Sequence, residues 1–329
     1  PYRPSWPVTE PETDLKMVEL HCHLDGIADP AMLTAIESAG APLAVTSEEL
    51  ARAYPVRSND DFIRWYGVAH GLEGSLDGFR PILAQHVERL VRQGVHYTEL
   101  MVGSSEILDG DDPLGTMKDF RAWLTALEAG RIQVELIMAV SRTRSAEWLA
   151  DVLDRTMPLF DEKLLVGLAV AGWPERGHPV APLRDQLSRA RDHGIGVEIH
   201  AGEWAGPESV WDALDNGRPD RLGHAVGAFA DPRLLDAIGE RGVHLEMCLT
   251  SNLKTGAIER FEDHPLARAR DLGLSFSLHT DDPGAFECTM TSEHQLARDV
   301  FGFTTENLQE MAESALAARF QPDLRIPSR

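Results

Sequence analysis

Short apolar segments alternate with longer helical patterns along most of the 329-residue chain, and this alternation restricts the possible folds more than any other feature. Strands that alternate with helices predict a parallel sheet, because parallel neighbours need a crossover connection, which is right-handed. Eight such units closing on one another form the TIM-type (β/α)8 barrel, an α/β fold that reaches this length as one domain. The predicted strands are 17–21, 95–102, 132–140, 164–170, 196–200, 221–223, 243–247 and 274–278.

Helical patterns fill the intervals between these strands. Asp29 followed by Pro30 indicates a helix start, because Asp caps helix N-termini and Pro fits the first helical position, and this helix is predicted to end near Gly40. Extra helices at 47–53, 60–72 and 76–93 form a large insertion after the first strand. The later predicted helices are 116–129, 145–156, 180–193, 208–214, one beginning at 231, 265–271, 292–300 and 306–317.

An open doubly wound sheet is the alternative to the barrel. It fits less well, because the one candidate for a dinucleotide-binding motif, Gly194-Ile195-Gly196, lacks a third glycine and precedes a strand. Residues 1–14 contain four prolines and no apolar period, which predicts an extended N-terminal arm. Residues 15–329 are predicted to form the single barrel domain.

The composition argues against two classes of partner. The net charge is −22 and the isoelectric point is near 4.9, whereas nucleic-acid binding needs clustered Lys and Arg, so no nucleic-acid partner is expected. Apolar runs such as 132–140 are too short to span a bilayer, and no signal-peptide pattern opens the chain, so no membrane association is expected.

The three cysteines are far apart and form no CxxC pair, which favours a reducing, cytoplasmic setting. The sequence does not indicate an oligomeric state.

Polar residues follow the carboxyl ends of several predicted strands, where barrel enzymes carry their active sites. The first strand leads into ELHCHLDG, in which His21 and His23 lie two residues apart and therefore point to the same side of a strand. Such a pair can hold a metal, but two ordinary histidines at a strand end would look the same. The other strand-end segments are HAGE at 200–203, GHA at 223–225, Glu246 with Cys248 and the TSN segment at 250–252, and HTDDP at 279–283.

Four of these residues, His21, His23, His200 and Asp281, have the donor chemistry of a zinc site with one open position. Zinc there would lower the pKa of a water molecule. Glu203 can then act as general acid or base, His224 can orient the water or stabilise a developing oxyanion, and Asp282 can contact the substrate. Taken singly, each has an ordinary structural alternative: Asp281 and Asp282 could belong to a turn before Pro283, and His224 to the packed core.

The ordered set of motifs resembles the adenosine/AMP deaminase family of metal-dependent amidohydrolases. The matching segments are ELHCHLDG at 19–26, VGLAVAG at 166–172, HAGE at 200–203, RLGHA at 221–225, ExCxTSN at 246–252 and SLHTDDP at 277–283. The resemblance runs from about residue 15 to 318. It implies a hydrolase that removes the exocyclic amine of a 6-aminopurine as ammonia with one zinc ion, on a small-molecule purine substrate.

The resemblance also implies a role for each matching residue. His21, His23, His200 and Asp281 would bind the zinc. Glu203 would protonate the ring nitrogen beside the attacked carbon, which makes that carbon electrophilic, and His224 would position the hydroxide. The contacts to the rest of the substrate would come from Asp282 and the backbone of Gly172, to ring nitrogens, and from Asp25, to the ribose.

Three positions depart from the family pattern and concern the substrate. Nucleoside deaminases usually have Asp where this chain has Ala169, often have Arg where it has Val102, and usually have Asn where it has His279. We expect these positions to flank the pocket. Asp25 favours a sugar-bearing substrate, adenosine or deoxyadenosine, over free adenine, for which the family more often has Glu there.

Three other functions remain open from the sequence. Adenine could be the substrate, and so could a modified nucleoside such as aminodeoxyfutalosine. A catalytically silent binding protein of the same fold should have lost a ligand or Glu203, and none is lost. The other zinc deaminase class is excluded, because its PCxxC motif is absent.

Overall fold

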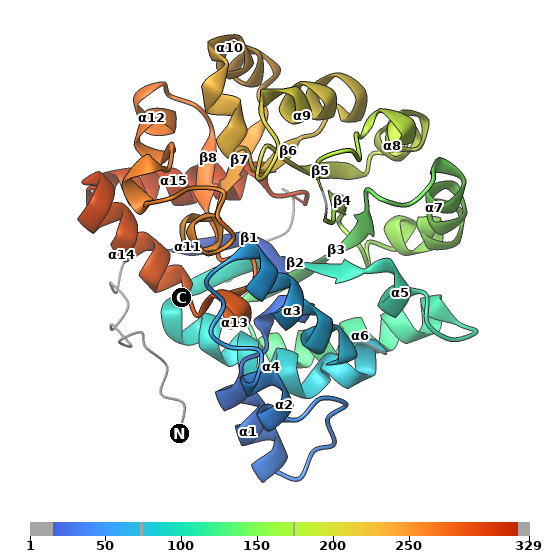
Figure 1. Cartoon of the computed structure of the whole chain (residues 1–329). Coiled ribbons are helices and arrows are strands. Elements are labelled where there is room, and N and C mark those ends of the chain that lie inside the picture. Colours follow the sequence, from blue (N-terminus) through green and yellow to red (C-terminus); the bar gives the residue numbers. More distant parts are fainter. Residues whose placement is uncertain (1–15, 73–74, 174, 322–329) are drawn as a thin grey trace.

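The structure, a computed structural model, describes residues 16–72, 75–173 and 175–321 (Figure 1). The predicted N-terminal arm, residues 1–14, lies outside the described residues.

Eight parallel strands form one sheet in which each strand pairs with the next along the chain. The last strand returns to the first: His23 N donates to Asp281 O at 2.9 Å, and Asp281 N donates to His21 O at 3.0 Å. The predicted barrel is therefore confirmed, and the first and last strands meet at their carboxyl ends. The strands are β1 (Met17–His23), β2 (Val95–Gly103), β3 (Gln133–Ser141), β4 (Gly167–Ala171), β5 (Gly196–Ala201), β6 (Arg221–His224), β7 (His244–Met247) and β8 (Phe276–Leu278).

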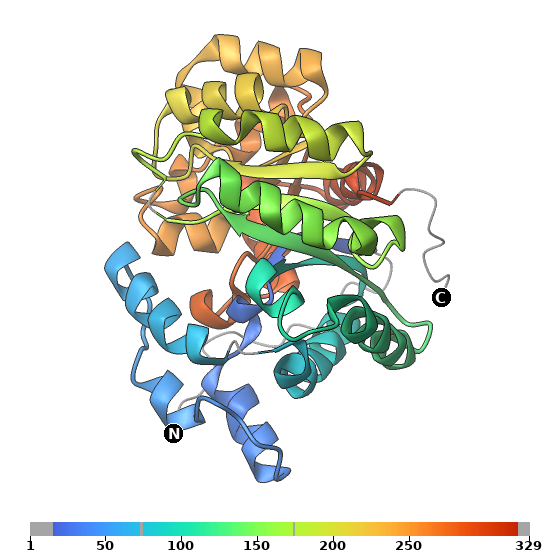
Figure 2. The same ribbon diagram turned by 90° about the vertical axis from the view of Figure 1, so that its right-hand side faces the viewer.

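Helices surround this barrel, and the predicted insertion after the first strand projects from one side of it (Figures 1 and 2). The insertion consists of α1 (Pro30–Ser38), α2 (Ser47–Ala51), α3 (Asn59–Ala69) and α4 (Leu76–Gln93). The helices of the other connections are α5 (Ser104–Ile107), α6 (Pro113–Glu128), α7 (Ala146–Asp161), α8 (Arg184–Asp192), α9 (Pro207–Asp212), α10 (Pro232–Arg241), α11 (Leu249–Lys254), α12 (Leu266–Asp271), α13 (Pro283–Phe286), α14 (Met290–Phe301) and α15 (Thr305–Ala318).

Side-chain caps explain where several helices begin. Asp29 accepts a hydrogen bond from Met32 N at 2.8 Å, as expected for a cap before Pro30. Asp112 caps α6 in the same way before Pro113, so this helix begins three residues earlier than predicted. The helices α5 and α11 have four and six residues and were not predicted.

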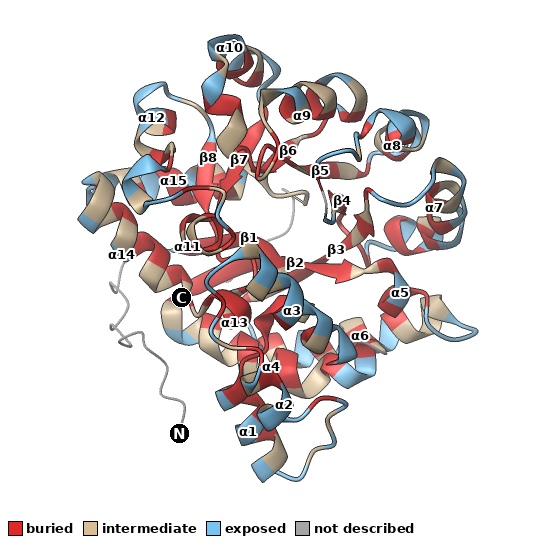
Figure 3. Cartoon of the chain, viewed as in Figure 1, coloured by how far each residue is buried: buried red, intermediate tan, exposed pale blue. Residues whose placement is uncertain are grey.

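The apolar core lies between the strands and the helices, while the barrel interior contains paired charges. Buried faces of the helices turn toward the strands and exposed faces turn outward (Figure 3). Inside the barrel, the fully buried Arg221 lies 2.6 Å from Glu99 and 2.7 Å from Glu246. The charge of Arg221 offsets the burial of Glu246 and lowers the pKa of this carboxyl, which matters because Glu246 supports the site described next. Within the described residues, no helix is both long and apolar enough to cross a membrane.

Candidate metal centre and active site

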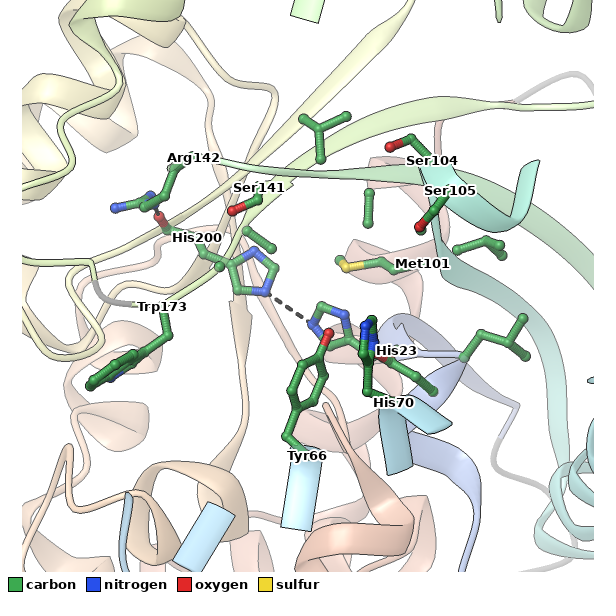
Figure 4. A pocket seen from close by; sticks show the side chains of 18 of the residues that line it. His23, Tyr66, His70, Met101, Ser104, Ser105, Ser141, Arg142, Trp173 and His200 are labelled. Atoms are coloured by element: carbon green, nitrogen blue, oxygen red, sulfur yellow. Dashed lines mark hydrogen bonds between the residues drawn. The ribbon is translucent and has the colours of Figure 1, made fainter. Parts of the chain in front are cut away.

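The four predicted metal ligands converge at the carboxyl ends of β1, β5 and β8. Nε2 of His21 and Nε2 of His23 each lie 3.3 Å from Oδ1 of Asp281. Nε2 of His23 also lies 3.2 Å from Nε2 of His200, and the two rings point at each other across the cavity (Figure 4). Three imidazole nitrogens and one carboxylate oxygen therefore face one point.

This point fits a metal better than it fits a network of hydrogen bonds. His21 is fully buried, and its Nε2 has no hydrogen-bond partner among the described residues. An unpaired buried polar atom is costly, and a metal ion would satisfy it. The donor set of imidazoles and one carboxylate is the set that zinc prefers.

Three of the candidate ligands, His21, His200 and Asp281, are each bound by a second polar group through the atom that faces away from the common point. Nδ1 of His21 lies 2.8 Å from Oε2 of Glu246, and Nδ1 of His200 lies 3.1 Å from Oε2 of Glu198. Ser251 Oγ donates to Oδ2 of Asp281 at 2.6 Å. These contacts orient Nε2 of both histidines and Oδ1 of Asp281 toward the common point.

Two site residues have left-handed backbone conformations although neither is glycine. Both His224 and Asp281 have φ of 63°. Such conformations are unfavourable for residues with a side chain and cluster at functional sites, where the surrounding structure enforces them. The structure thus stores backbone strain at the ends of β6 and β8.

Hydrogen bonds determine which nitrogen of His224 carries the proton. Leu266 N donates to Nδ1 of His264, so Nε2 of His264 donates to Oδ1 of Asn252 at 3.2 Å. The amide nitrogen of Asn252 then donates to Nδ1 of His224 at 3.0 Å. Burial lowers the pKa of His224 to about 3, so the ring is neutral and its proton is on Nε2. That N–H lies 3.5 Å from Oε2 of Glu203 and 4.0 Å from Oδ2 of Asp281.

The environment of Glu203 favours its protonated form. Burial raises the pKa of Glu203 well above its usual value, and the charge of Asp281 raises it further. Its Oε1 accepts a hydrogen bond from Thr255 Oγ at 3.3 Å. The carboxyl group can therefore hold a proton near neutral pH.

The three predicted substrate residues, Asp25, Gly172 and Asp282, line the same cavity of about 730 Å3 as His200, Glu203 and His224. Gly172 has φ of 106°, and a Cβ there would lie 2.7 Å from Ser141 Oγ, so this position requires glycine. Burial and the charge of Asp281 raise the pKa of Asp282 well above its usual value. Asp282 can therefore donate a hydrogen bond from a neutral carboxyl group.

The three positions that depart from the family pattern differ in how they lie relative to this cavity. Val102 lines it. Ala169 packs instead with Met101 and Ile137 in a small apolar cluster of the barrel. His279 lies deeper, with Nδ1 3.0 Å from Oε1 of Glu19, because its side chain points into the barrel interior.

Sequence reasoning missed several residues that support the site. Glu198 lies two residues before His200 on the same strand, so the two side chains point to the same face. This spacing could have predicted their contact. Glu246 and the TSN segment were singled out without a role. His264 carried no signal, because its contact with Asn252 depends on how two loops pack together.

Comparisons with known proteins agree on one family. The sequence model described as adenosine deaminase matches residues 16–325. An adenine deaminase from Rhizobium johnstonii is 32% identical over 314 residues, covering 94% of this chain and 96% of that protein. An adenosine deaminase from Pectobacterium atrosepticum is 30% identical over 318 residues, covering 93% of each.

A solved structure shows the same fold. The crystal structure of an amidohydrolase from Burkholderia ambifaria with bound zinc has a TM-score of 0.76 to this chain at 22% identity, covering 93% of this chain and 86% of that one. At this identity the likeness establishes the arrangement of strands and helices.

Proposed function

The chain belongs to the adenosine deaminase family and is thus a hydrolytic deaminase acting on C–N bonds, and we propose that it removes the 6-amino group of a purine nucleoside as ammonia. The observation that carries this proposal is the convergence of His21, His23, His200 and Asp281 beside a protonated Glu203. That arrangement combines a metal-binding set with a proton donor in one cavity.

One zinc ion per chain is the metal we propose, held by His21, His23, His200 and Asp281. The unpaired Nε2 of His21 and the donor chemistry of these residues support this choice. Ligand atoms of His21, His200 and Asp281 lie within 4.8 Å of one another, and His224 belongs to the same group. When bound, zinc would lower the pKa of a water molecule so that a nucleophile is available near neutral pH.

Glu203 and His224 perform the proton chemistry in this proposal. Glu203 transfers its proton to the ring nitrogen beside the amine-bearing carbon, which draws electrons from that carbon and opens it to attack. His224 is neutral and has its proton on Nε2, so it donates a hydrogen bond to the attacking oxygen and orients it. The same donor stabilises negative charge on this oxygen as the water loses its proton.

The remaining polar groups hold the substrate. Asp282 donates from its protonated carboxyl group to another ring nitrogen, and the backbone of Gly172 contacts the ring on a further side. Asp25 is half-buried at the end of β1 and binds a sugar hydroxyl. The cavity is also far larger than a purine base, so we favour adenosine or deoxyadenosine over adenine.

A second candidate substrate is a nucleoside with a larger group on its sugar, of the aminodeoxyfutalosine type. Three of the four exposed large hydrophobic residues of the described chain, Ile63, Tyr66 and Trp173, line this cavity. Trp148 lines it as well, with the guanidinium of Arg144 5.5 Å from its ring centre. Exposed aromatic surface at a pocket favours an apolar or aromatic group of a ligand.

We also propose a cytoplasmic location and a single catalytic domain, residues 15–329. The three cysteines are buried and unpaired, as is usual in reducing compartments. The acidic charge supports a small-molecule substrate over a nucleic acid.

An ultraviolet-absorbance assay tests the proposal. Zinc-loaded protein is incubated separately with adenine, adenosine, deoxyadenosine, AMP and an aminodeoxyfutalosine-type nucleoside, and kcat/KM is compared. Highest turnover of a nucleoside supports the first proposal, and a preference for the extended nucleoside supports the second. Turnover of adenine alone would overturn both.

A further inference from the structure

Glu175 is a buried carboxylate, 6% exposed, in the connection between β4 and α8, and the proposed chemistry gives it no role. Its two oxygens accept four hydrogen bonds from the segment that contains Glu203. Oε1 accepts from Gly202 N and from Ser209 Oγ, both at 2.5 Å. Oε2 accepts from Trp204 N and Ala205 N, both at 2.8 Å. The backbone on both sides of Glu203 is therefore bound to one side chain.

Two arginines bind carbonyl groups of the same segment. Arg142, 4% exposed, donates from Nη2 to His200 O, and Arg176 donates from Nε to Trp204 O at 2.7 Å. Together, Arg142, Glu175 and Arg176 form what we call the loop clamp. It binds the main chain of residues 200–205 at five atoms, while the side chain of Glu203 lines the cavity.

The segment needs such support, because its own sequence does not make it rigid. Gly202 lies within it and has φ of 73°, and Gly206 follows it directly. Among the described residues, the polar contacts of the Glu203 side chain are long, 3.3 Å to Thr255 and 3.5 Å to His224. Its position is therefore set by the main chain, and the main chain is set by the clamp.

We propose that Glu175 is a positioning residue for Glu203. It holds Glu203 where its proton can reach the substrate, and it takes no part in proton transfer itself. This inference rests on the proposed role of Glu203 as the acid.

The substitution Glu175→Gln tests this role. Each oxygen of Glu175 accepts two hydrogen bonds, so an amide nitrogen in place of one oxygen would face two donors and accept neither. In the zinc-loaded enzyme we expect kcat to fall by about 10- to 100-fold, the effect of a small misplacement of a catalytic group, with KM and zinc content nearly unchanged. Hydrogen exchange of the amides of residues 202–205 should become faster in this variant.

A double substitution separates positioning from a general structural effect. With Glu203→Gln already present, Glu175→Gln should lower the residual kcat by less than about twofold, because the group it positions is gone. An equal loss in both backgrounds would overturn the proposal. So would a single variant with wild-type kcat and wild-type amide exchange.

Two further variants complete the experiment. Glu208→Gln is the matched control, since the exposed Glu208 accepts from Gly206 N in the same loop at 3.1 Å, and its kcat should not change.

If Glu175→Gln does not fold, Ser209→Ala removes one donor to the same carboxylate and should lower kcat several-fold. Unchanged kcat there would overturn the proposal. Full activity of Glu203→Gln alone would instead identify the proposed acid as the error, and this inference would fail with it.

Discussion

Nδ1 of His21 lies 2.8 Å from Oε2 of Glu246, although 225 positions separate the two residues in the chain. Hydrogen bonding to His21 and the charge of Arg221 offset burial and lower the pKa of Glu246 to about 2, so it is ionised and accepts from His21. When the His21 ring is neutral, Glu246 holds its proton on Nδ1, so the lone pair of Nε2 faces the candidate metal position.

Glu246→Gln should weaken metal binding without removing a ligand. The amide is a poorer acceptor for the His21 proton, and such supporting contacts are worth about 10- to 100-fold in metal affinity. Zinc affinity is measured by competition with a chelator. The half-buried surface pair of Glu88 with Arg131 provides the control variant Glu88→Gln, which should bind zinc normally. Equal affinities in all three proteins would contradict the supporting role.

Asp281→Ala should remove the metal. The carboxylate faces both His21 and His23, so its loss leaves three neutral ligands and a weaker site. Elemental analysis should find about one zinc per wild-type chain and much less in the variant. The exposed Asp271→Ala variant is the control. Unchanged zinc content in Asp281→Ala would show that this ligand assignment is wrong.

Glu203→Gln should keep zinc and the fold but lower kcat by about 100- to 10,000-fold, the usual contribution of a general acid. The amide cannot transfer a proton to the ring nitrogen. Steady-state kinetics on the best substrate measure the loss, and zinc content and circular dichroism check the protein. Activity close to wild type would refute the acid role.

Trp173→Ala should show whether a substituent on the sugar of the substrate contacts Trp173 in the cavity. Trp173 is 48% exposed and lines the cavity. For a nucleoside with an aromatic group on its sugar, we expect kcat/KM to fall by about tenfold, as for a lost aromatic contact, with adenosine affected by less than about twofold. Leu272, 52% exposed and not among the lining residues, gives the control Leu272→Ala. A uniform loss for both substrates would argue against an aromatic subsite.

Glu293→Gln should reduce the pH dependence of stability. Burial raises the pKa of Glu293, which accepts from Thr250 N, to about 7. Between the unfolded pKa near 4.5 and this value the folded state binds the proton more tightly, so the free energy of unfolding falls as pH rises. The contribution of this one group is up to about 3 kcal/mol.

Urea unfolding of zinc-loaded protein at pH 5 and pH 8 measures this effect. The decrease in unfolding free energy between the two pH values should be smaller in Glu293→Gln than in wild type. The exposed Glu313→Gln on α15 should behave as wild type. A decrease of the same size in all three proteins would mean that Glu293 does not carry the proton.

The fold and the candidate ligands could be predicted from local patterns. Alternation of strands and helices specifies a parallel barrel, and the carboxyl ends of its strands all lie at one end. His21 and His23 share a face because side chains on a strand repeat every two residues. Hence the residues that follow the strands were correctly expected to meet in one place.

The groups that support those ligands could not be predicted in this way. Glu246, Asn252 and Glu175 act through contacts with residues on other strands or loops. Such contacts depend on the register of neighbouring strands and on the path of each loop, which the residue pattern of one segment does not contain. His279 illustrates the same limit, since its position near Asp281 suggested the pocket but its side chain hydrogen-bonds to Glu19 inside the barrel.

The sequence by itself thus determined the barrel and the identity of the candidate ligands, because periodicity and chemical type are local properties. Its resemblance to a known family implied the class of reaction. Only the tertiary structure decided the proton position on His224, the raised pKa of Glu203 and the clamp around residues 200–205. The physical reason is that burial and hydrogen-bond partners arise when distant segments pack together. The histidine pair of β1 meets Asp281 only when the chain after β8 returns beside β1.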